Sequence, residues 1–321
     1  MKQVLKIGTR ESQLAVWQAS YVQALLKQND VNSELIFIKS EGDIDTVTPL
    51  YELGVQGIFT KTLDAALLSK RIDIAVHSMK DVPTVLATGI RQTAVLKRAS
   101  YKDIFVFKGD RKLIENKLNS PFPIHDSPIQ HSPFTIATSS IRRKAQWLHR
   151  YPNHTIANLR GNVNTRLRKI EENDWNGAIF AAAGVERIHL RPENSIDLDW
   201  MLPAPAQGAI TIVCRNEDDF SFNACQLLND QPAAICTKVE RDFLRTLLGG
   251  CSTPISALAI IENDSIIFKG NICSPDGKKK IEINKTASIQ NSGELGIMAA
   301  NELLKNEEAQ QIIYRIQNAK K

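Results

Sequence analysis

Residues 72–81 read Ile-Asp-Ile-Ala-Val-His-Ser-Met-Lys-Asp, a short apolar segment that runs directly into a polar one. The apolar part, Ile72–Val76, has the length and composition of a buried strand. The polar part, His77–Asp81, follows the carboxyl end of that strand, which is where open α/β sheets bind their ligands. The stretch therefore predicts an α/β fold with a ligand site at the end of this strand.

The first half of the chain alternates strand-like and helix-like segments. Val4–Ile7 and Glu34–Lys39 have the pattern of strands, and between them Glu11–Lys27 carries apolar residues at helical spacing. After a break near Lys97–Tyr101 the alternation starts again, which indicates a second α/β domain. Its strands are expected at Asp103–Phe107, Phe134–Thr138, Thr155–Leu159 and Ala178–Ala182, and its helices are expected to begin near Ser140, Asn162 and Val185.

The last third of the chain has a different order of elements. Trp200–Gly208, with two prolines, has the composition of a hinge, and a buried-type strand, Ala209–Cys214, follows it. Beyond it we expect an α+β domain with helices at Pro232–Leu248 and Gly293–Lys305 and strands at Ser256–Ile261 and Ile266–Gly270. The predicted fold is two α/β domains and a smaller C-terminal α+β domain, covering residues 1–98 with 202–219, 99–201 and 220–321.

One segment of the second domain interrupts the alternation. Lys108–Pro133 contains four prolines and shows no periodic apolar residues. We expect a surface excursion on which few core contacts depend.

The composition is that of an ordinary soluble protein. Of 321 residues, 43% are hydrophobic and 23% charged, and no apolar run approaches the roughly 18 residues that a membrane span needs. The first nine residues alternate charged and apolar side chains where a signal peptide would be continuously apolar, which favours the cytoplasm. The five cysteines and six histidines have neither a zinc-site spacing nor a disulfide pattern, so we expect no metal.

The positive charge is concentrated in one block. Between Arg142 and Arg168 there are seven basic residues and no acid, so the rest of the chain is net negative although the whole carries +5. Guanidinium groups match the two-point geometry of carboxylates and phosphates, which predicts an anionic ligand. A solvated basic face is one alternative. Nucleic acid is another, although only two aromatic residues accompany the block and no nucleic-acid motif is found.

Two polar strings predict anion binding within this block. Thr138–Arg143 follows a strand and begins a helix, so hydroxyls and unpaired backbone N–H groups converge there with two arginines. For Ser140 alone, a helix cap without further function is the alternative. Asn158–Asn162 repeats the arrangement after the next strand, with Arg160 at the strand end and Arg166 in the following helix.

Lys80 and Asp81 form the best candidate pair for acid–base chemistry, because a carboxylate at a strand end beside a lysine can be positioned and partly desolvated. A plain salt bridge between the two residues is the alternative.

Cys251 lies in a glycine-flanked loop, whereas Cys214 and Cys236 lie in apolar or helical stretches. We expect the thiol of Cys251 to be the exposed one, with an inert loop cysteine as the alternative.

Taken together, these strings resemble the porphobilinogen deaminase (hydroxymethylbilane synthase) family from one end of the chain to the other. The resemblance implies two domains like those of periplasmic binding proteins and a third, smaller domain. It also implies a transferase of haem biosynthesis that links four porphobilinogen molecules head to tail, releases ammonia and gives hydroxymethylbilane. It rests on seven motifs in the family's order, Ile7–Ala15, Asp73–Pro83, Thr138–Arg143, Leu159–Val163, Ala183–Arg187, Gln207–Ala209 and Gly249–Cys251.

The resemblance also implies a role for each candidate residue. A dipyrromethane cofactor would be held by a thioether to Cys251, and Asp81 would assist the loss of ammonia and stabilise the electrophile through its pyrrole N–H. The expected partners are porphobilinogen and its oligopyrrole intermediates, with no nucleic acid, no membrane and a monomeric enzyme. The positions matching cofactor-binding residues are Lys80, Ser139, Ser140, Arg142 and Arg143, and those matching substrate-binding residues are Arg10, Ser12, Arg160, Arg166 and Arg187.

Three features depart from the family's pattern. Residues 54–57 read Gly-Val-Gln-Gly where the family commonly has Gly-Gly-Lys-Gly, so Gln56 replaces a cation, although Lys61 is kept. Ala206 stands where glycine is frequent, which matters only if the backbone there needs a positive φ. The Lys108–Pro133 excursion is longer than usual. None of these changes removes Asp81 or Cys251.

Two functions of other classes remain open from the residues alone. A two-domain protein that clamps a small dicarboxylate without chemistry would share the fold, but it has no use for a glycine-flanked cysteine. A module that binds nucleic acid or another polyanion through the basic block would depend on phosphate contacts, whose affinity falls steeply with salt.

Overall fold

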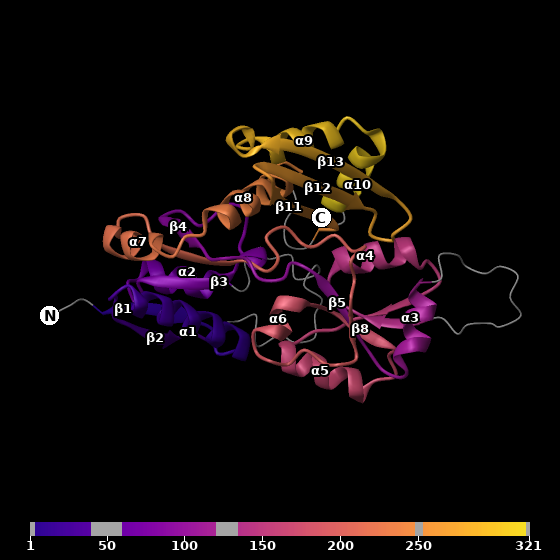
Figure 1. Ribbon diagram of the computed structural model, residues 1–321, viewed down its shortest axis with the longest axis horizontal. Helices are drawn as coiled ribbons and strands as arrows, with labels where there is room; N and C mark the ends of the chain where they lie inside the picture. Colours follow the sequence, from indigo (N-terminus) through magenta and orange to yellow (C-terminus); the bar gives the residue numbers. More distant parts are fainter. Residues whose placement is uncertain (1–3, 40–59, 120–133, 248–252, 319–321) are drawn as a thin grey trace, which may run out of the picture.

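The computed structural model describes residues 4–39, 60–119, 134–247 and 253–318. Within these ranges the strands form three sheets, two with five strands and one with three. In Figure 1 the first sheet lies at the left, the second at the right, and the third lies above both with the C-terminal helices. The arrangement confirms the predicted class of two α/β units followed by an α+β unit.

The first sheet has the order β2-β1-β3-β10-β4. Three parallel strands lie on one side, and β10 is antiparallel to both of its neighbours. Its strands are β1 (Leu5–Thr9), β2 (Ser33–Phe37), β3 (Ile74–Ser78), β4 (Ile90–Val95) and β10 (Ile210–Arg215). Parallel neighbours need long crossovers, and the helices of this unit are α1 (Gln13–Gln28), α2 (Lys61–Leu68) and α7 (Asp219–Gln226).

The second sheet, of order β7-β6-β8-β5-β9, repeats this plan. Its three parallel strands are again followed by an antiparallel one, β5. The strands are β5 (Asp103–Phe107), β6 (Thr135–Ala137), β7 (Thr155–Ala157), β8 (Gly177–Ala181) and β9 (Ser195–Asp197), and the helices are α3 (Arg111–Asn119), α4 (Ile141–Arg150), α5 (Val163–Glu172) and α6 (Ala182–Glu186). The polar strings predicted from the sequence follow the carboxyl ends of the parallel strands in both sheets.

The third sheet is an antiparallel meander covered by helices. One apolar cluster joins all three strands to the helices of this unit. It centres on Phe243 and Phe268, whose ring centroids lie 5.1 Å apart. The elements are α8 (Gln231–Thr246), β11 (Ile255–Glu262), β12 (Ser265–Cys273), β13 (Lys280–Ser288), the 3-10 turn η3 (Ile289–Asn291), α9 (Leu295–Leu303) and α10 (Glu307–Asn318). This unit therefore has a core of its own.

The prediction that Lys108–Pro133 is a surface excursion on which few core contacts depend is wrong for its first part. Residues 111–119 form α3, and Ile114 and Leu118 are only 6% and 5% exposed, packed into the core around Trp147. Only two buried apolar residues, Ile114 and Leu118, mark the packed face of this short helix, and a pair at i and i+4 gives a weak periodic signal, which caused the error. Residues 120–133 of the excursion lie outside the described residues.

Other differences concern element boundaries and elements that were not predicted. Most predicted strands and helices are present within a few residues, which is the usual uncertainty of element ends. The helix expected to begin near Val185 instead runs from Ala182 to Glu186. Elements without a prediction are β4, β9, α7, β13 and α10.

The segment predicted as a hinge, Trp200–Gly208, connects β9 to β10 and therefore the second sheet to the first. Within it the buried Ala206 has φ = 62°, in the left-handed region that favours glycine. Its backbone N–H donates to Glu240 Oε2 at 2.6 Å. The backbone at this position does have a positive φ, so the replacement of the frequent glycine by alanine matters here.

Candidate active site

The polar string after β3 forms a short turn, η2 (Met79–Asp81). The backbone N–H of Met79 donates to the carbonyl of Ala209 at 3.0 Å, and the Met79 side chain is buried. Lys80 and Asp81 are partly buried. The turn therefore holds the lysine and the carboxylate at the end of a central strand, as the sequence predicts.

Lys80 lies among groups from both large sheets. Its Nζ donates to Gln207 Oε1 at 3.3 Å. The pKa of Lys80 is lowered to about 8, mainly by burial and also by the nearby guanidiniums of Arg143 and Arg142, against the opposing charges of Asp81 and Asp103. The charged groups of the second unit therefore influence the pKa of a lysine in the first.

Gln207 connects Lys80 of the first unit with Asp103 of the second. While its Oε1 accepts from Lys80, its Nε2 donates to Asp103 Oδ1 at 3.0 Å and to the carbonyl of Tyr101 at 2.8 Å. Asp103 is the first residue of β5 and is fully buried. Because both ends of the amide are bound, Gln207 fixes the distance between Lys80 and the second sheet.

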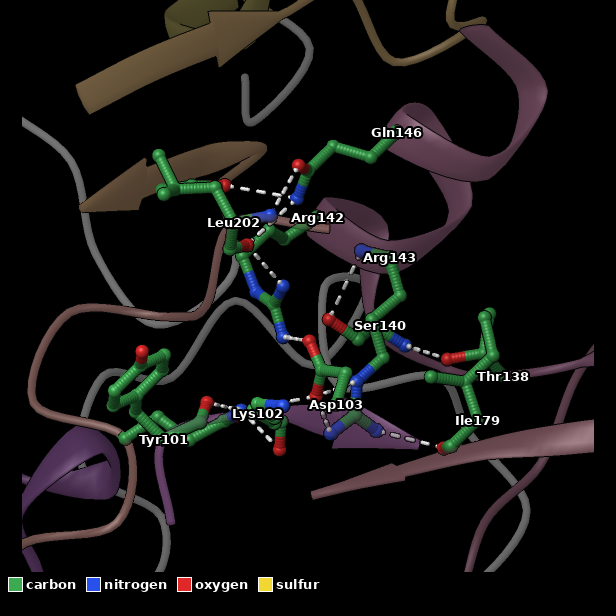
Figure 2. A network of polar contacts seen from close by, with 12 residues as sticks. Tyr101, Lys102, Asp103, Thr138, Ser140, Arg142, Arg143, Gln146, Ile179 and Leu202 are labelled. Carbon is green, nitrogen blue, oxygen red and sulfur yellow. Dashed lines mark hydrogen bonds and ion pairs between the residues drawn. The ribbon is translucent and has the colours of Figure 1, made fainter. Parts of the chain in front are cut away.

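Arg142 and Arg143 converge on Asp103 (Figure 2). Arg142 Nη2 lies 2.8 Å from Oδ2, and Arg143 binds Oδ1 through Nε at 3.1 Å and Nη2 at 2.8 Å. Their remaining Nη1 groups donate to the carbonyls of Leu202 and Ile179, both at 2.8 Å. Burial raises the pKa of Asp103, but the two guanidiniums outweigh it and the pKa lies below its ordinary value. One carboxylate is shared by two arginines.

The two serines of the same string have structural contacts. Ser140 is the N-cap of α4 and accepts from the N–H of Arg143 at 3.5 Å, so it caps the helix. Ser139 Oγ donates to Asn158 Oδ1 at 2.7 Å and also bonds the carbonyl of Leu159, whose N–H donates back to it. The strand ends of β6 and β7 are therefore tied together at Ser139.

Arg160 and Arg166 lie next to the arginine pair. Arg160 is buried, and Arg166 donates from Nε to the carbonyl of Gly161 at 2.7 Å. The pKa of Arg166 is lowered to about 10, mainly by burial and also by the like charges of Arg143 and Arg160, against the attraction of Asp81. The arginines of the basic block thus repel one another and face the carboxylate of the first sheet.

The remaining predicted residues lie around the ends of β1 and α6. Arg10 follows β1, and Ser12 is the N-cap of α1, accepting from Ala15 N–H at 3.4 Å. Arg187 donates to the carbonyl of Gly208 at 2.7 Å, and its guanidinium lies over the ring of Trp17, 5.7 Å from the centroid. Burial lowers the pKa of Arg187 to about 10.

Three residues of this network were not predicted as site residues. Asp103 was assigned only to a strand, Gln207 only to a motif, and Glu240 to no site at all. A signal for Asp103 was available, since a block with seven cations and no acid needs a counter-charge from elsewhere in the chain. Nothing in the spacing shows which acid supplies it.

Cys251 and residues 54–57 lie outside the described residues. The four cysteines at 214, 225, 236 and 273 are free and buried, and burial raises the pKa of each thiol. In the part of the chain that the structure describes, no cluster of His, Cys, Asp or Glu could hold a metal ion, and no helix is long and apolar enough to span a bilayer. A separate pocket is lined by Gln146, His149, Arg150, Trp200 and Lys280 and contains none of the predicted site residues.

The sequence matches two domains of one protein family. Residues 5–222 match "Porphobilinogen deaminase, dipyromethane cofactor binding domain", and residues 234–305 match "Porphobilinogen deaminase, C-terminal domain". Similar proteins include the porphobilinogen deaminases of Chlorobium phaeobacteroides (37% identity, 95% of this chain and 96% of that one) and Campylobacter hominis (38%, 94% and 94%). The chloroplastic enzyme of Oryza sativa is 38% identical over 88% of this chain and 78% of its own.

Solved structures give a weaker likeness. The probable amino-acid ABC transporter extracellular-binding protein ytmK from Bacillus subtilis aligns with a TM-score of 0.40 at 12% identity, covering 71% of this chain and 91% of its own. The VFT2 domain of BvgS from Bordetella pertussis aligns with a TM-score of 0.39 at 13% identity, covering 70% and 86%.

The fold and the site define a protein of two α/β units with a cationic centre between them, and the matches say which one. The chain belongs to the porphobilinogen deaminase family. It is an enzyme of tetrapyrrole biosynthesis that polymerises porphobilinogen, and it contains the family's dipyrromethane cofactor binding domain.

Proposed function

We propose that Asp81 is the acid and base of each condensation, that the surrounding cations hold the carboxylates of the pyrroles, and that the cofactor is attached to Cys251. The observation that carries the proposal is the bridge through Gln207, which joins the Lys80–Asp81 turn to the Asp103–arginine cluster. A proton-transferring group and an anion-binding group are thereby held beside each other.

The charge of the site suits dipyrromethane and its extensions. Each pyrrole carries an acetate and a propionate, so a growing chain accumulates carboxylates. Around the site Asp103 and Asp81 face a larger number of cations, and the mutual repulsion that lowers the pKa of Arg166 is relieved by any anion placed among them. The residues present therefore fit the group.

Asp81 is proposed to donate a proton to the departing amino group of porphobilinogen. Its carboxylate then accepts a hydrogen bond from the pyrrole N–H and stabilises the positive charge that develops on the ring. Lys80, which the charge of Asp81 helps to keep protonated, is proposed to bind a cofactor carboxylate. When bound, dipyrromethane supplies the pyrrole carbon on which the first substrate condenses.

The other residues are proposed to bind and orient. Arg143 engages three of its five N–H donors with Asp103 and a backbone carbonyl, so a ligand can be bound through the second N–H of Nη1 or of Nη2. Ser140 has a backbone role that leaves its hydroxyl proton available. The proposed cofactor set is Lys80, Ser139, Ser140, Arg142 and Arg143, and the proposed substrate set is Arg10, Ser12, Arg160, Arg166 and Arg187.

Four finer statements are part of the same proposal. The substrate is added four times before release as hydroxymethylbilane, and oligopyrrole intermediates stay on the enzyme between additions. The enzyme is a cytoplasmic monomer. Its domains are proposed to cover residues 1–98 with 202–219, 99–201 and 220–321, which agrees with the membership of β10 in the first sheet. The packing of α7 (Asp219–Gln226) against that sheet moves the boundary between the first and third domains to about residue 226.

The intact mass of the purified protein tests the attachment. We expect an excess equal to two linked pyrrole units in the wild type and in Cys236→Ala, which removes a buried thiol on α8, and no excess in a folded Cys251→Ser variant. The bare sequence mass in the wild type, or the full excess in Cys251→Ser, would remove Cys251 as the anchor.

A further inference from the structure

The turn that carries Lys80 and Asp81 is also held from the α8 side. Arg241, on α8, donates from Nη1 to the carbonyl oxygens of Met79 at 3.2 Å and Val82 at 2.9 Å, and from Nη2 to that of Pro83 at 2.5 Å. These carbonyls flank the two functional residues of the turn on both sides. One side chain thus binds the backbone before and after them.

A turn of this kind depends on outside donors. It is only three residues long, and the carbonyls of Val82 and Pro83 lie beyond it in a segment that is neither helix nor strand. Partly buried carbonyl oxygens need hydrogen-bond donors. A guanidinium presents several donors in one rigid plane, so it can bind these oxygens together and fix their relative positions.

The helix that carries Arg241 is itself fixed by the preceding residue. Glu240 is fully buried and binds both Nη atoms of Arg98, at 2.6 and 3.1 Å. It also accepts from the backbone N–H groups of Ala206 and Ala259 at 2.6 and 2.7 Å. Because neighbouring residues on a helix point in different directions, Glu240 binds the hinge and β11 while Arg241 reaches the catalytic turn.

We infer that Arg241 is a positioning residue that sets the orientation of Asp81. α8 ends at Thr246, five residues before Cys251, so the same helix leads to the proposed cofactor anchor and holds the turn that carries the proposed acid. The inference rests on the role proposed for Asp81.

The first test is Arg241→Met in cofactor-loaded enzyme. We expect porphobilinogen consumption at saturating substrate to fall about 10²-fold, the loss that misplacing a catalytic group by about an ångström produces, while KM changes much less than kcat. Arg245→Met is the matched control, since Arg245 lies one turn further along the helix, has a 51% exposed side chain and binds Asp242. Equal rates in the two variants would overturn the inference.

A double-mutant cycle with Asp81→Asn separates positioning from a general structural effect. If Arg241 acts through Asp81, adding Arg241→Met to Asp81→Asn costs little further rate, whereas independent effects multiply and would overturn the inference. If Arg241→Met does not fold, Arg241→Lys takes its place, with a smaller expected loss because the charge is kept and the fork is lost. A wild-type rate in Asp81→Asn alone would instead show that the proposed acid is wrong, and the positioning role would fail with it.

Discussion

Asp103 binds Arg143 through two nitrogens of one guanidinium, with Oδ1 accepting from Nε at 3.1 Å and from Nη2 at 2.8 Å. The same carboxylate pairs with Arg142 through its other oxygen. One buried negative charge therefore serves two buried positive charges. The arginine cluster keeps an excess of positive charge, which is the property that a ligand with many carboxylates requires.

Removing the carboxylate of Asp103 should destabilise the protein strongly. Asp103→Asn leaves two buried guanidiniums without their counter-charge, and breaking a buried pair in this way costs about 3–5 kcal/mol of unfolding free energy. Urea unfolding measures the loss. Glu308→Gln, which breaks the exposed pair with Lys279, is the control and should cost about 0–1 kcal/mol. Similar small losses in both variants would mean that Asp103 is not the counter-charge of the cluster.

Lys80 should make the stability of the cofactor-free protein depend on pH. Its pKa is about 8 in the folded state against an ordinary value of 10.5, so between these values the unfolded chain binds more protons. Unfolding free energy then rises with pH across this window, and the rise should be absent in Lys80→Met. Denaturant unfolding of both proteins between about pH 8 and pH 10 gives the comparison. Parallel pH dependences in the two proteins would contradict the lowered pKa.

The position of the Lys80–Asp81 pair could be predicted because its determinants are adjacent in sequence. The apolar strand and the polar string follow one another directly, and strand ends in α/β sheets are ligand sites. The cap at Ser140 was predictable for the same reason, since a cap bonds to N–H groups within one turn. The local sequence pattern is therefore sufficient to predict the position of the Lys80–Asp81 pair and the cap at Ser140.

The counter-charges could not be predicted in this way. Asp103 lies 40 residues from Arg143, and Gln207 lies 127 residues from Lys80, so their contacts depend on the tertiary fold. Arg241 lies 162 residues from Met79 and reads in the sequence as one more charge on an amphipathic helix. Contacts of this kind carry no periodic signal, because they join elements that are far apart in the sequence.

Ala206 offers a test of backbone strain in the hinge. Its left-handed φ of 62° costs a residue with a Cβ about 1–2 kcal/mol. Glycine relieves this strain but loses a buried methyl group worth about 0.8 kcal/mol and gains unfolded-state entropy, so Ala206→Gly should change the unfolding free energy by less than about 1 kcal/mol. Ala206→Val adds bulk at a position where β-branched residues are outliers, and it should cost about 3 kcal/mol. A valine variant as stable as the wild type would show that this backbone is not constrained.

Ile114 and Leu113 test the corrected position of α3. Ile114 is 6% exposed and Leu113 is 63% exposed, although they are neighbours on one helix. Ile114→Ala should cost about 2–5 kcal/mol, as for buried aliphatic residues, and Leu113→Ala about 0.5 kcal/mol or less. Thermal or urea unfolding decides, and a near-zero cost at Ile114 would restore the view that this segment makes no core contacts.

The role of Asp81 is the centre of the account, and single-turnover consumption of porphobilinogen on cofactor-loaded enzyme tests it most directly. Asp81→Asn keeps the shape of the side chain but removes its charge and its proton, so the rate should fall by about 10²–10⁴-fold, while Asp219→Asn, an exposed aspartate of α7, leaves it unchanged. Asp81→Glu should be less damaging than Asp81→Asn, because the carboxyl group is kept on a longer stem. If Asp81→Asn consumed porphobilinogen as fast as the wild type with its cofactor in place, another group would have to supply the proton and the account would be wrong.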